Sequence, residues 1–180
     1  MSAYQATKSH VLNRGVPPDS FLDELVAWGK TASEDIFAPN AVADIYSSVH
    51  NTLGPYPDNT YRRGVMLEVM RVLAGFESSW NWNEGIDPGN PNRGETRSQE
   101  AGAWQVSADS MALSPALKSL APNDPIQFQR AMKADHPLAM EYIARLLRVT
   151  THENGPVMRH EIDPWLRKAA LEEFLRLIAA

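Results

Sequence analysis

The sequence predicts a mainly helical protein with one folded domain. Apolar residues recur at intervals of three and four, which places them on one face of an α-helix, in segments separated by Gly, Pro and Asn. The chain has 180 residues and 43% hydrophobic content, a length that a single hydrophobic core serves. We expect residues 1–18 to form a flexible N-terminal arm and residues 19–180 to form the domain.

Composition and charge argue against several classes of function. The chain carries 17 basic and 22 acidic residues, so its net charge of -5 gives no electrostatic footprint for nucleic acid. Cysteine is absent, which excludes disulfides and thiolate metal ligands, and the five histidines show no recognised ligand spacing. No Gly-rich phosphate loop precedes a helix. We predict no metal, no cofactor and no nucleic-acid partner.

Membrane insertion and signal-directed export are also disfavoured. The longest apolar segments are interrupted by Arg or Glu well before the roughly 20 residues of a membrane-spanning helix. Residues 1–15 lack the apolar run of a secretory signal. We expect a protein made in the cytoplasm without a signal peptide.

The most informative helix is predicted to begin at Asp58 or Asn59 and to end at Glu77. Its apolar stripe consists of Met66, Val69, Met70, Leu73 and Phe76. Its charged residues, predicted to face elsewhere, are Arg62, Arg63, Glu68 and Arg71. Further helices are predicted over residues 19–30, 40–53 and 137–149, and from residue 163 onward, with caps at Asp19 or Ser20, Asn40 and Asp163.

Glu77 is the candidate catalytic residue. It follows Leu73 by four residues, which places its carboxyl group beside the apolar face at the C-terminal end of the helix. Apolar surroundings and the negative end of the helix dipole both raise the pKa of a carboxyl group. A Glu that stays protonated near neutral pH can act as the general acid of glycoside cleavage. The alternative is a structural buried pair with an arginine.

A long polar loop follows, from Trp80 to Ala101, rich in Gly, Asn and Pro. Trp80 and Trp82, near its start, either stack on sugar rings or hold the base of the loop in place. After the loop, Gly102 and Ala103 are small enough for close approach of the backbone.

Three segments together resemble the lysozyme-like superfamily, which includes the soluble lytic transglycosylases and goose-type lysozymes. Residues 75–80, GFESSW, match a helix that ends in Glu-Ser, and residues 102–107, GAWQVS, resemble the Gly-Ala/Phe-x-x-Gln segment. Residues 151–156, THENGP, resemble the segment that closes the cleft, with His152, Asn154 and Gly155 on that wall. The resemblance implies a lysozyme-like fold with a long polar loop or small β-element beside the cleft.

The resemblance implies site residues and leaves the mechanism open. Glu77 is the expected catalytic acid, and Asp87, ten residues on, is the favoured second carboxylate among Asp87, Glu84, Glu95, Glu100 and Asp109. The expected substrate-binding residues are Ser78, Trp80, Trp82, Gly102, Ala103, Gln105, Asn154 and Gly155. Goose-type lysozymes carry an aspartate where this chain has Ser107, whereas lytic transglycosylases need only the Glu.

The chain is most similar to small glycoside hydrolase effectors of bacterial type VI secretion. This implies a muramidase that cuts the β-1,4 MurNAc-GlcNAc bond of peptidoglycan glycan strands in the periplasm of a target bacterium, and a cognate immunity protein that occludes its cleft. A lytic transglycosylase and a phage endolysin are alternatives with the same fold. A sugar-binding module without catalysis is the alternative from another class.

Overall fold

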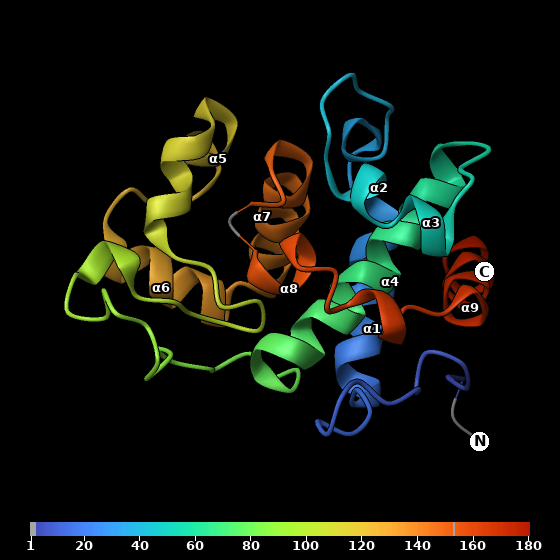
Figure 1. Cartoon of the computed structure of the whole chain (residues 1–180), viewed down its shortest axis with the longest axis horizontal. Coiled ribbons are helices and arrows are strands. Elements are labelled where there is room, and N and C mark those ends of the chain that lie inside the picture. The colour runs from blue at the N-terminus through green and yellow to red at the C-terminus, as the bar shows by residue number, and fades with distance from the viewer. Residues whose placement is uncertain (1–2, 153) are drawn as a thin grey trace.

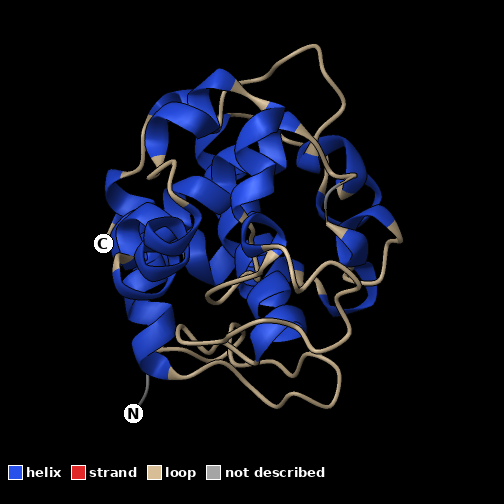
Figure 2. Ribbon diagram, turned by 90° about the vertical axis from the view of Figure 1, so that its left-hand side faces the viewer, coloured by secondary structure: helices blue, strands red, loops and turns tan. Residues whose placement is uncertain are grey.

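The computed structural model describes residues 3–152 and 154–180, and this part of the chain is mainly helical (Figure 1). The α-helices are α1 (Asp19–Thr31), α2 (Ile45–Ser48), α3 (His50–Leu53), α4 (Asn59–Ser78), α5 (Pro115–Leu120), α6 (Pro125–Ala134), α7 (His136–Val149), α8 (Gly155–Met158) and α9 (Lys168–Ala179). Short 3-10 helices are η1 (Glu34–Ile36), η2 (Thr96–Ser98), η3 (Ala108–Leu113) and η4 (Asp163–Trp165). The predicted mainly helical class is confirmed (Figure 2).

Helix α4 runs through the centre of the molecule, in contact with α1, α7, α8 and α9 (Figure 1). It begins where predicted, because the Asp58 carboxylate accepts a hydrogen bond from the Tyr61 N–H at 2.7 Å. The predicted stripe is buried except for Phe76, which is half-buried. Residues on other faces of the helix, such as Val65 and Val72, are also buried. None of the helices in residues 3–152 and 154–180 is long and apolar enough to span a membrane.

The charged residues of α4 correct the prediction that they face away from the core. Glu68 and Arg71 are both completely buried, and two Arg71 nitrogens each donate to a Glu68 carboxylate oxygen at 2.7 Å. Glu68 also accepts from the Arg167 N–H at 2.8 Å, and Arg71 donates to the Ser9 carbonyl at 3.2 Å. Arg63 is buried as well. A helix enclosed on all sides keeps its charged residues by pairing them inside the core.

The N-terminal segment, expected to be a flexible arm, is irregular but anchored. Residues 3–18 contain turns and bends and no helix. The Glu173 carboxylate accepts hydrogen bonds from the N–H groups of Gln5, Ala6 and Thr7 at 2.9, 3.2 and 2.8 Å. One buried carboxylate therefore holds three consecutive residues of this segment against α9.

The helix predicted over residues 40–53 is wrong in its extent, since α2 and α3 are two short helices separated by a single residue. Asp44, not Asn40, caps the first of them, and its carboxylate accepts from the Tyr46 N–H at 2.9 Å. Val42, which lies within the predicted range, precedes the helix and is 60% exposed. Before Asp44, the helical spacing of apolar residues therefore does not correspond to a helix.

The last helix also begins later than predicted. Asp163 starts only the short helix η4, and α9 begins at Lys168. Leu166 and Arg167 are extended between the two, in the conformation that lets the Arg167 N–H reach Glu68. The tertiary hydrogen bond to Glu68 therefore accompanies a break in the predicted helix. Within α9, Ala170 and Phe174 are buried, and Leu177 and Ile178 are partly buried.

We predict that the Glu68–Arg71 pair is needed for stability as a unit. Arg71→Met leaves the Glu68 carboxylate buried without its cation, so it lowers the free energy of unfolding by about 3–5 kcal/mol in urea denaturation. The double variant Glu68→Leu/Arg71→Met removes both charges and is expected to be more stable than Arg71→Met alone. A double variant that loses the sum of the two single losses would contradict the coupling.

Candidate active site

Glu77 lies in the last turn of α4 and lines a cavity of about 230 Å³. The other lining residues are Asp87, Glu100, Gln105, Gly155 and Pro156. They come from the polar loop, from the turn that follows it and from the first turn of α8. The three segments that carry the family resemblance therefore meet around one carboxyl group.

The electrostatic surroundings of Glu77 raise its pKa to about 7. Burial is the largest cause, because it disfavours the charged form of the carboxyl group. The negative charges of Asp87 and Glu100 act in the same direction, and the positive charge of Arg159 opposes them. Glu77 therefore keeps its proton much closer to neutral pH than an ordinary glutamate does.

Trp80 fixes the point where α4 ends. Ser79 and Trp80 both adopt left-handed backbone conformations, with φ of 56° and 61°. The Trp80 indole lies so close over Gly75 that a Cβ there would be 2.7 Å from the ring, and its Nε1 donates to the Arg71 carbonyl at 2.8 Å. Only 4% of Trp80 is exposed. Its place is therefore at the base of the loop, and the expected stacking on a sugar is not available to it.

Trp82 lies in an aromatic cluster that holds the loop against α1 and α7. Its ring stacks on His136 with centroids 3.9 Å apart and an interplanar angle of 8°. The rings of Phe21 and Trp104 lie 5.2 and 5.3 Å away. Trp82 is not among the residues that line the Glu77 cavity. Of the two readings of these tryptophans, the observed contacts favour the one in which they hold the loop.

Ser78 joins the end of α4 to the turn after the loop. Its hydroxyl is buried and donates to the Ala103 carbonyl at 2.8 Å, and it accepts from the Asn81 N–H at 3.0 Å. A buried hydroxyl with these partners positions Glu77 relative to the turn. We therefore assign Ser78 a positioning role in place of the expected contact with substrate.

The turn from Ala101 to Val106 is closed by an antiparallel bridge with N–O distances of 3.0 and 3.3 Å. Gly102 has a φ of 78°, and a Cβ on it would lie 2.5 Å from the Met132 carbonyl oxygen, so the expected close approach is present. Ala103, which is part of the turn, is buried. Gln105, also left-handed with a φ of 47°, lines the cavity.

The opposite wall is the start of α8. Asn154 is buried and caps this helix, since its side-chain oxygen accepts from the Val157 N–H at 3.3 Å. Gly155 lines the cavity, and so does Pro156, which was not among the predicted site residues. His152, mapped onto this wall from the sequence, is exposed and is not among the cavity residues.

Two of the five candidate second carboxylates reach the cavity, Asp87 and Glu100. Asp87 is exposed, and its Oδ1 accepts from the Gly89 N–H at 2.8 Å. Glu100 is half-buried, and its Oε1 accepts from the Asn90 amide at 2.7 Å. Glu100 Oε2 is buried and has no hydrogen-bond partner within the described residues. Glu100 is thus the more firmly held of the two, with one oxygen free for a water or substrate group.

The remaining three candidates do not line the cavity. Asp109 accepts from Ser98 and lies 3.6 Å from Arg97, and Glu84 accepts from Asn81 at 3.0 Å. Glu95 is exposed on the loop. A further pair, Arg159 and Glu161 at 2.8 Å, influences the charge of Glu77 without having been predicted. Their spacing in the sequence carries no signal of a site.

Comparisons with known proteins give no relative for this chain. No family model, no curated protein and no solved structure matches it. Within residues 3–152 and 154–180, no group of three or more His, Asp or Glu side chains is placed to hold a metal ion.

We predict that Gly102→Ala is destabilising because of its backbone. The new Cβ must escape the Met132 carbonyl oxygen and occupy a left-handed conformation, which costs about 2 kcal/mol or more in the free energy of unfolding. Gly94→Ala is the matched control, since no atom lies within 4 Å of the position that its new Cβ would take. Equal unfolding free energies for the two variants would refute the close approach at Gly102.

The raised pKa of Glu77 predicts a pH-dependent gain in stability for Glu77→Gln. The folded pKa of about 7 exceeds the unfolded value of 4.5, so the folded state binds the proton more tightly and wild-type stability falls as pH rises between these values. The neutral Gln is expected to be more stable than Glu at pH 8, by on the order of 2 kcal/mol, and equally stable at pH 4. Thermal unfolding at both pH values measures this, and a gain of the same size at pH 4 would contradict it.

Proposed function

We propose that this chain is a glycoside hydrolase of lysozyme-like fold with Glu77 as its general acid. The observation that carries the proposal is a carboxyl group with a pKa of about 7 in a cavity that holds two further carboxylates. A protonated carboxyl beside ionisable carboxylates is the arrangement that glycoside cleavage uses. The matching order of the three lysozyme-like segments around this cavity supports it.

The particular activity we propose is that of a muramidase, which cleaves the β-1,4 MurNAc-GlcNAc bond of peptidoglycan. Glu77 donates its proton to the glycosidic oxygen as the bond to the anomeric carbon breaks. Positive charge then develops on the sugar ring, and the anionic groups of Asp87 and Glu100 stabilise it. The same two charges raise the pKa of Glu77 and so keep its proton available.

For the second carboxylate, the contacts support Glu100 ahead of Asp87, which the sequence spacing favoured. Asn90 holds one oxygen of Glu100, and the other is buried without a partner within the described part of the chain. That free oxygen is suited to accept a proton from an attacking water. Asp87, which is exposed, then contributes its charge.

The biological setting is proposed from the resemblance to type VI secretion effectors. In this setting the enzyme acts on the wall of a target bacterium, and a cognate immunity protein occludes the Glu77 cavity. Action as a phage endolysin uses the same chemistry and the same cavity. The two settings differ in delivery and leave the residue assignments unchanged.

The test is digestion of purified peptidoglycan sacculi, with the released fragments identified by mass. Glu77→Gln is expected to lower the rate by a factor on the order of a hundred or more, because the proton donor is lost. The wild-type rate is expected to fall as pH rises through about 7, where Glu77 loses its proton. Glu95→Gln, which changes an exposed loop carboxylate, is the matched control and should keep the wild-type rate.

The products separate the alternatives. Reducing MurNAc ends and a larger loss in Glu100→Gln than in Asp87→Asn support the hydrolytic scheme. Anhydro-MurNAc ends would replace it with a lytic transglycosylase in which Glu77 acts alone. Absence of fragments from the wild type would refute the enzyme and leave a sugar-binding module.

A further inference from the structure

A second cavity, of about 370 Å³, lies at the opposite end of α4 from Glu77. Its lining residues are Asn40, Val42, Asp44, Tyr46, Ser47, His50, Pro55, Tyr56 and Arg62. Arg62 is in the first turn of α4 and Glu77 in the last. At about 1.5 Å per residue along a helix, the two positions are ~22 Å apart, so this cavity is separate from the candidate active site.

Arg62 is held in this cavity by two aromatic rings. Its guanidinium carbon lies 4.3 Å from the centre of the Tyr46 ring and 5.2 Å from that of Tyr56. Cation–π contacts of this kind fix the plane of a guanidinium and leave its N–H groups unused. Within the described residues, the Arg62 side chain has no carboxylate partner and no hydrogen-bond acceptor.

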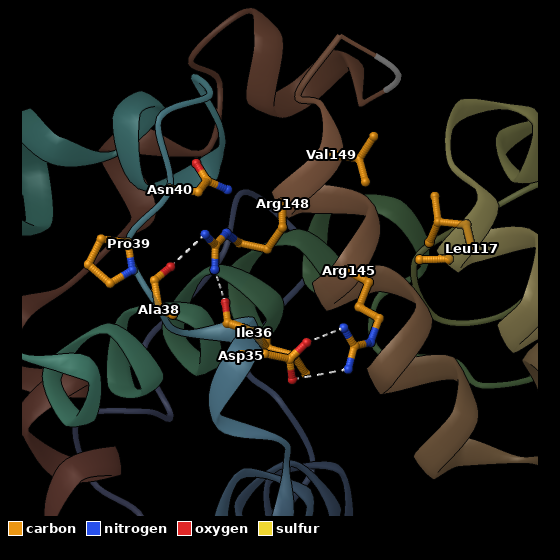
Figure 3. A pocket seen from close by; sticks show the side chains of 10 residues that line it. Asp35, Ile36, Ala38, Pro39, Asn40, Leu117, Arg145, Arg148 and Val149 are labelled. Atoms are coloured by element: carbon orange, nitrogen blue, oxygen red, sulfur yellow. Dashed lines mark hydrogen bonds and ion pairs between the residues drawn. The ribbon is translucent and has the colours of Figure 1, made fainter.

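The arginines of a neighbouring pocket show the contrast (Figure 3). Arg145 is paired with Asp35 at 2.8 Å. Arg148 donates to the Ala38 carbonyl at 2.7 Å and to the carbonyl of Ile36. These guanidinium groups fasten η1 and the nearby residue Ala38 to α7, so they have few donors left for a ligand. Arg62 differs because its donors are free of partners in the part of the chain that the structure describes.

The other groups around Arg62 are rigid and leave its positive charge uncompensated. The Tyr46 hydroxyl donates to the Arg62 carbonyl at 3.1 Å, and the Tyr56 hydroxyl donates to the Tyr46 carbonyl at 2.7 Å, which locks both rings. The buried Asp44 carboxylate is paired with Arg148 at 2.7 Å. Among residues 3–152 and 154–180, the cavity therefore presents one free cation, and Ser47 and His50 add polar groups to its wall.

We propose that this cavity binds a carboxylate group, with Arg62 as the residue that recognises it. A planar guanidinium with free N–H groups pairs with a carboxylate through two parallel hydrogen bonds. On the proposed substrate the carboxylate is that of a peptide stem of peptidoglycan, and this identification rests on the proposed function. Helix α8, which Figure 1 shows beside α4, contacts both α2 and α4 and carries one wall of the Glu77 cavity. We therefore expect a polymer that lies across α8 to reach both cavities.

The direct test is titration of the protein with muramyl dipeptide, which carries one free carboxylate, followed by NMR at the ring resonances of Tyr46 and Tyr56. The methyl ester of the same compound is the uncharged control ligand. Arg62→Gln is expected to weaken binding of the acid at least tenfold, to the level of the ester. Arg130→Gln, on the exposed face of α6, is the matched control and should bind as the wild type does.

Several results would overturn the inference. Equal affinity for acid and ester, or equal affinity of wild type and Arg62→Gln, excludes a carboxylate site at Arg62. Thermal unfolding checks that Arg62→Gln is folded, and Arg62→Lys, which keeps the charge without the planar fork, should bind more weakly than wild type and more tightly than Arg62→Gln.

The outcomes also separate this inference from the proposed function. Binding that depends on Arg62, in a protein that releases no fragments from sacculi, supports the carboxylate site and refutes the muramidase. Fragment release without any binding of the acid at Tyr46 and Tyr56 supports the muramidase and refutes the site.

Discussion

The buried pair of Glu68 and Arg71 is the interaction on which the rest of the structure depends. Both side chains are completely enclosed, so their charges must be satisfied inside the protein. Their remaining hydrogen-bonding groups reach Ser9 near the start of the chain and Arg167 before the last helix. The Arg71 carbonyl accepts the indole N–H of Trp80. One turn of α4 therefore connects both ends of the chain to the point where the candidate site begins.

The position of Glu77 follows from this central helix. Because α4 is enclosed along most of its length, Glu77 in its last turn is still partly buried where the helix leaves the core. Ser78 holds the turn from Ala101 to Val106 against the helix end, and Trp104 donates to the Met70 carbonyl at 2.9 Å. The same packing that stabilises the fold thus brings Gln105 and Glu100 beside Glu77. The contacts that stabilise the fold therefore also bury Glu77. Burial raises the pKa of Glu77, so the charged form of its carboxyl group destabilises the folded protein.

Sequence reasoning located the features that depend on local rules. Helix α4 and its cap at Asp58 follow from periodicity and capping, and the position of Glu77 follows from the same helix. The close approach of the backbone at Gly102 was predicted from the small size of the residue, which is also a local feature. What the sequence did not reveal depends on contacts between distant residues. The burial of Glu68 and Arg71, the break before α9 and the interior place of Trp80 each arise from a partner far along the chain or on another face.

The choice of Glu100 over the other loop carboxylates depends on the path of the polar loop, and the sequence of this loop has no periodicity from which its path could be predicted. Arg62 carried no signal either, because an arginine without a partner looks the same in a sequence as one with a partner.

The most direct test of the account is the pKa of the Glu77 side chain itself. Carbon-13 NMR of selectively labelled glutamate, assigned by comparison with Glu77→Gln, follows its titration without any assumption about substrate. We predict a midpoint of about 7 that falls in the double variant Asp87→Asn/Glu100→Gln, since two negative neighbours are removed. A midpoint near the ordinary 4.5 in the wild type would contradict it, because Glu77 would then carry no proton to donate at neutral pH.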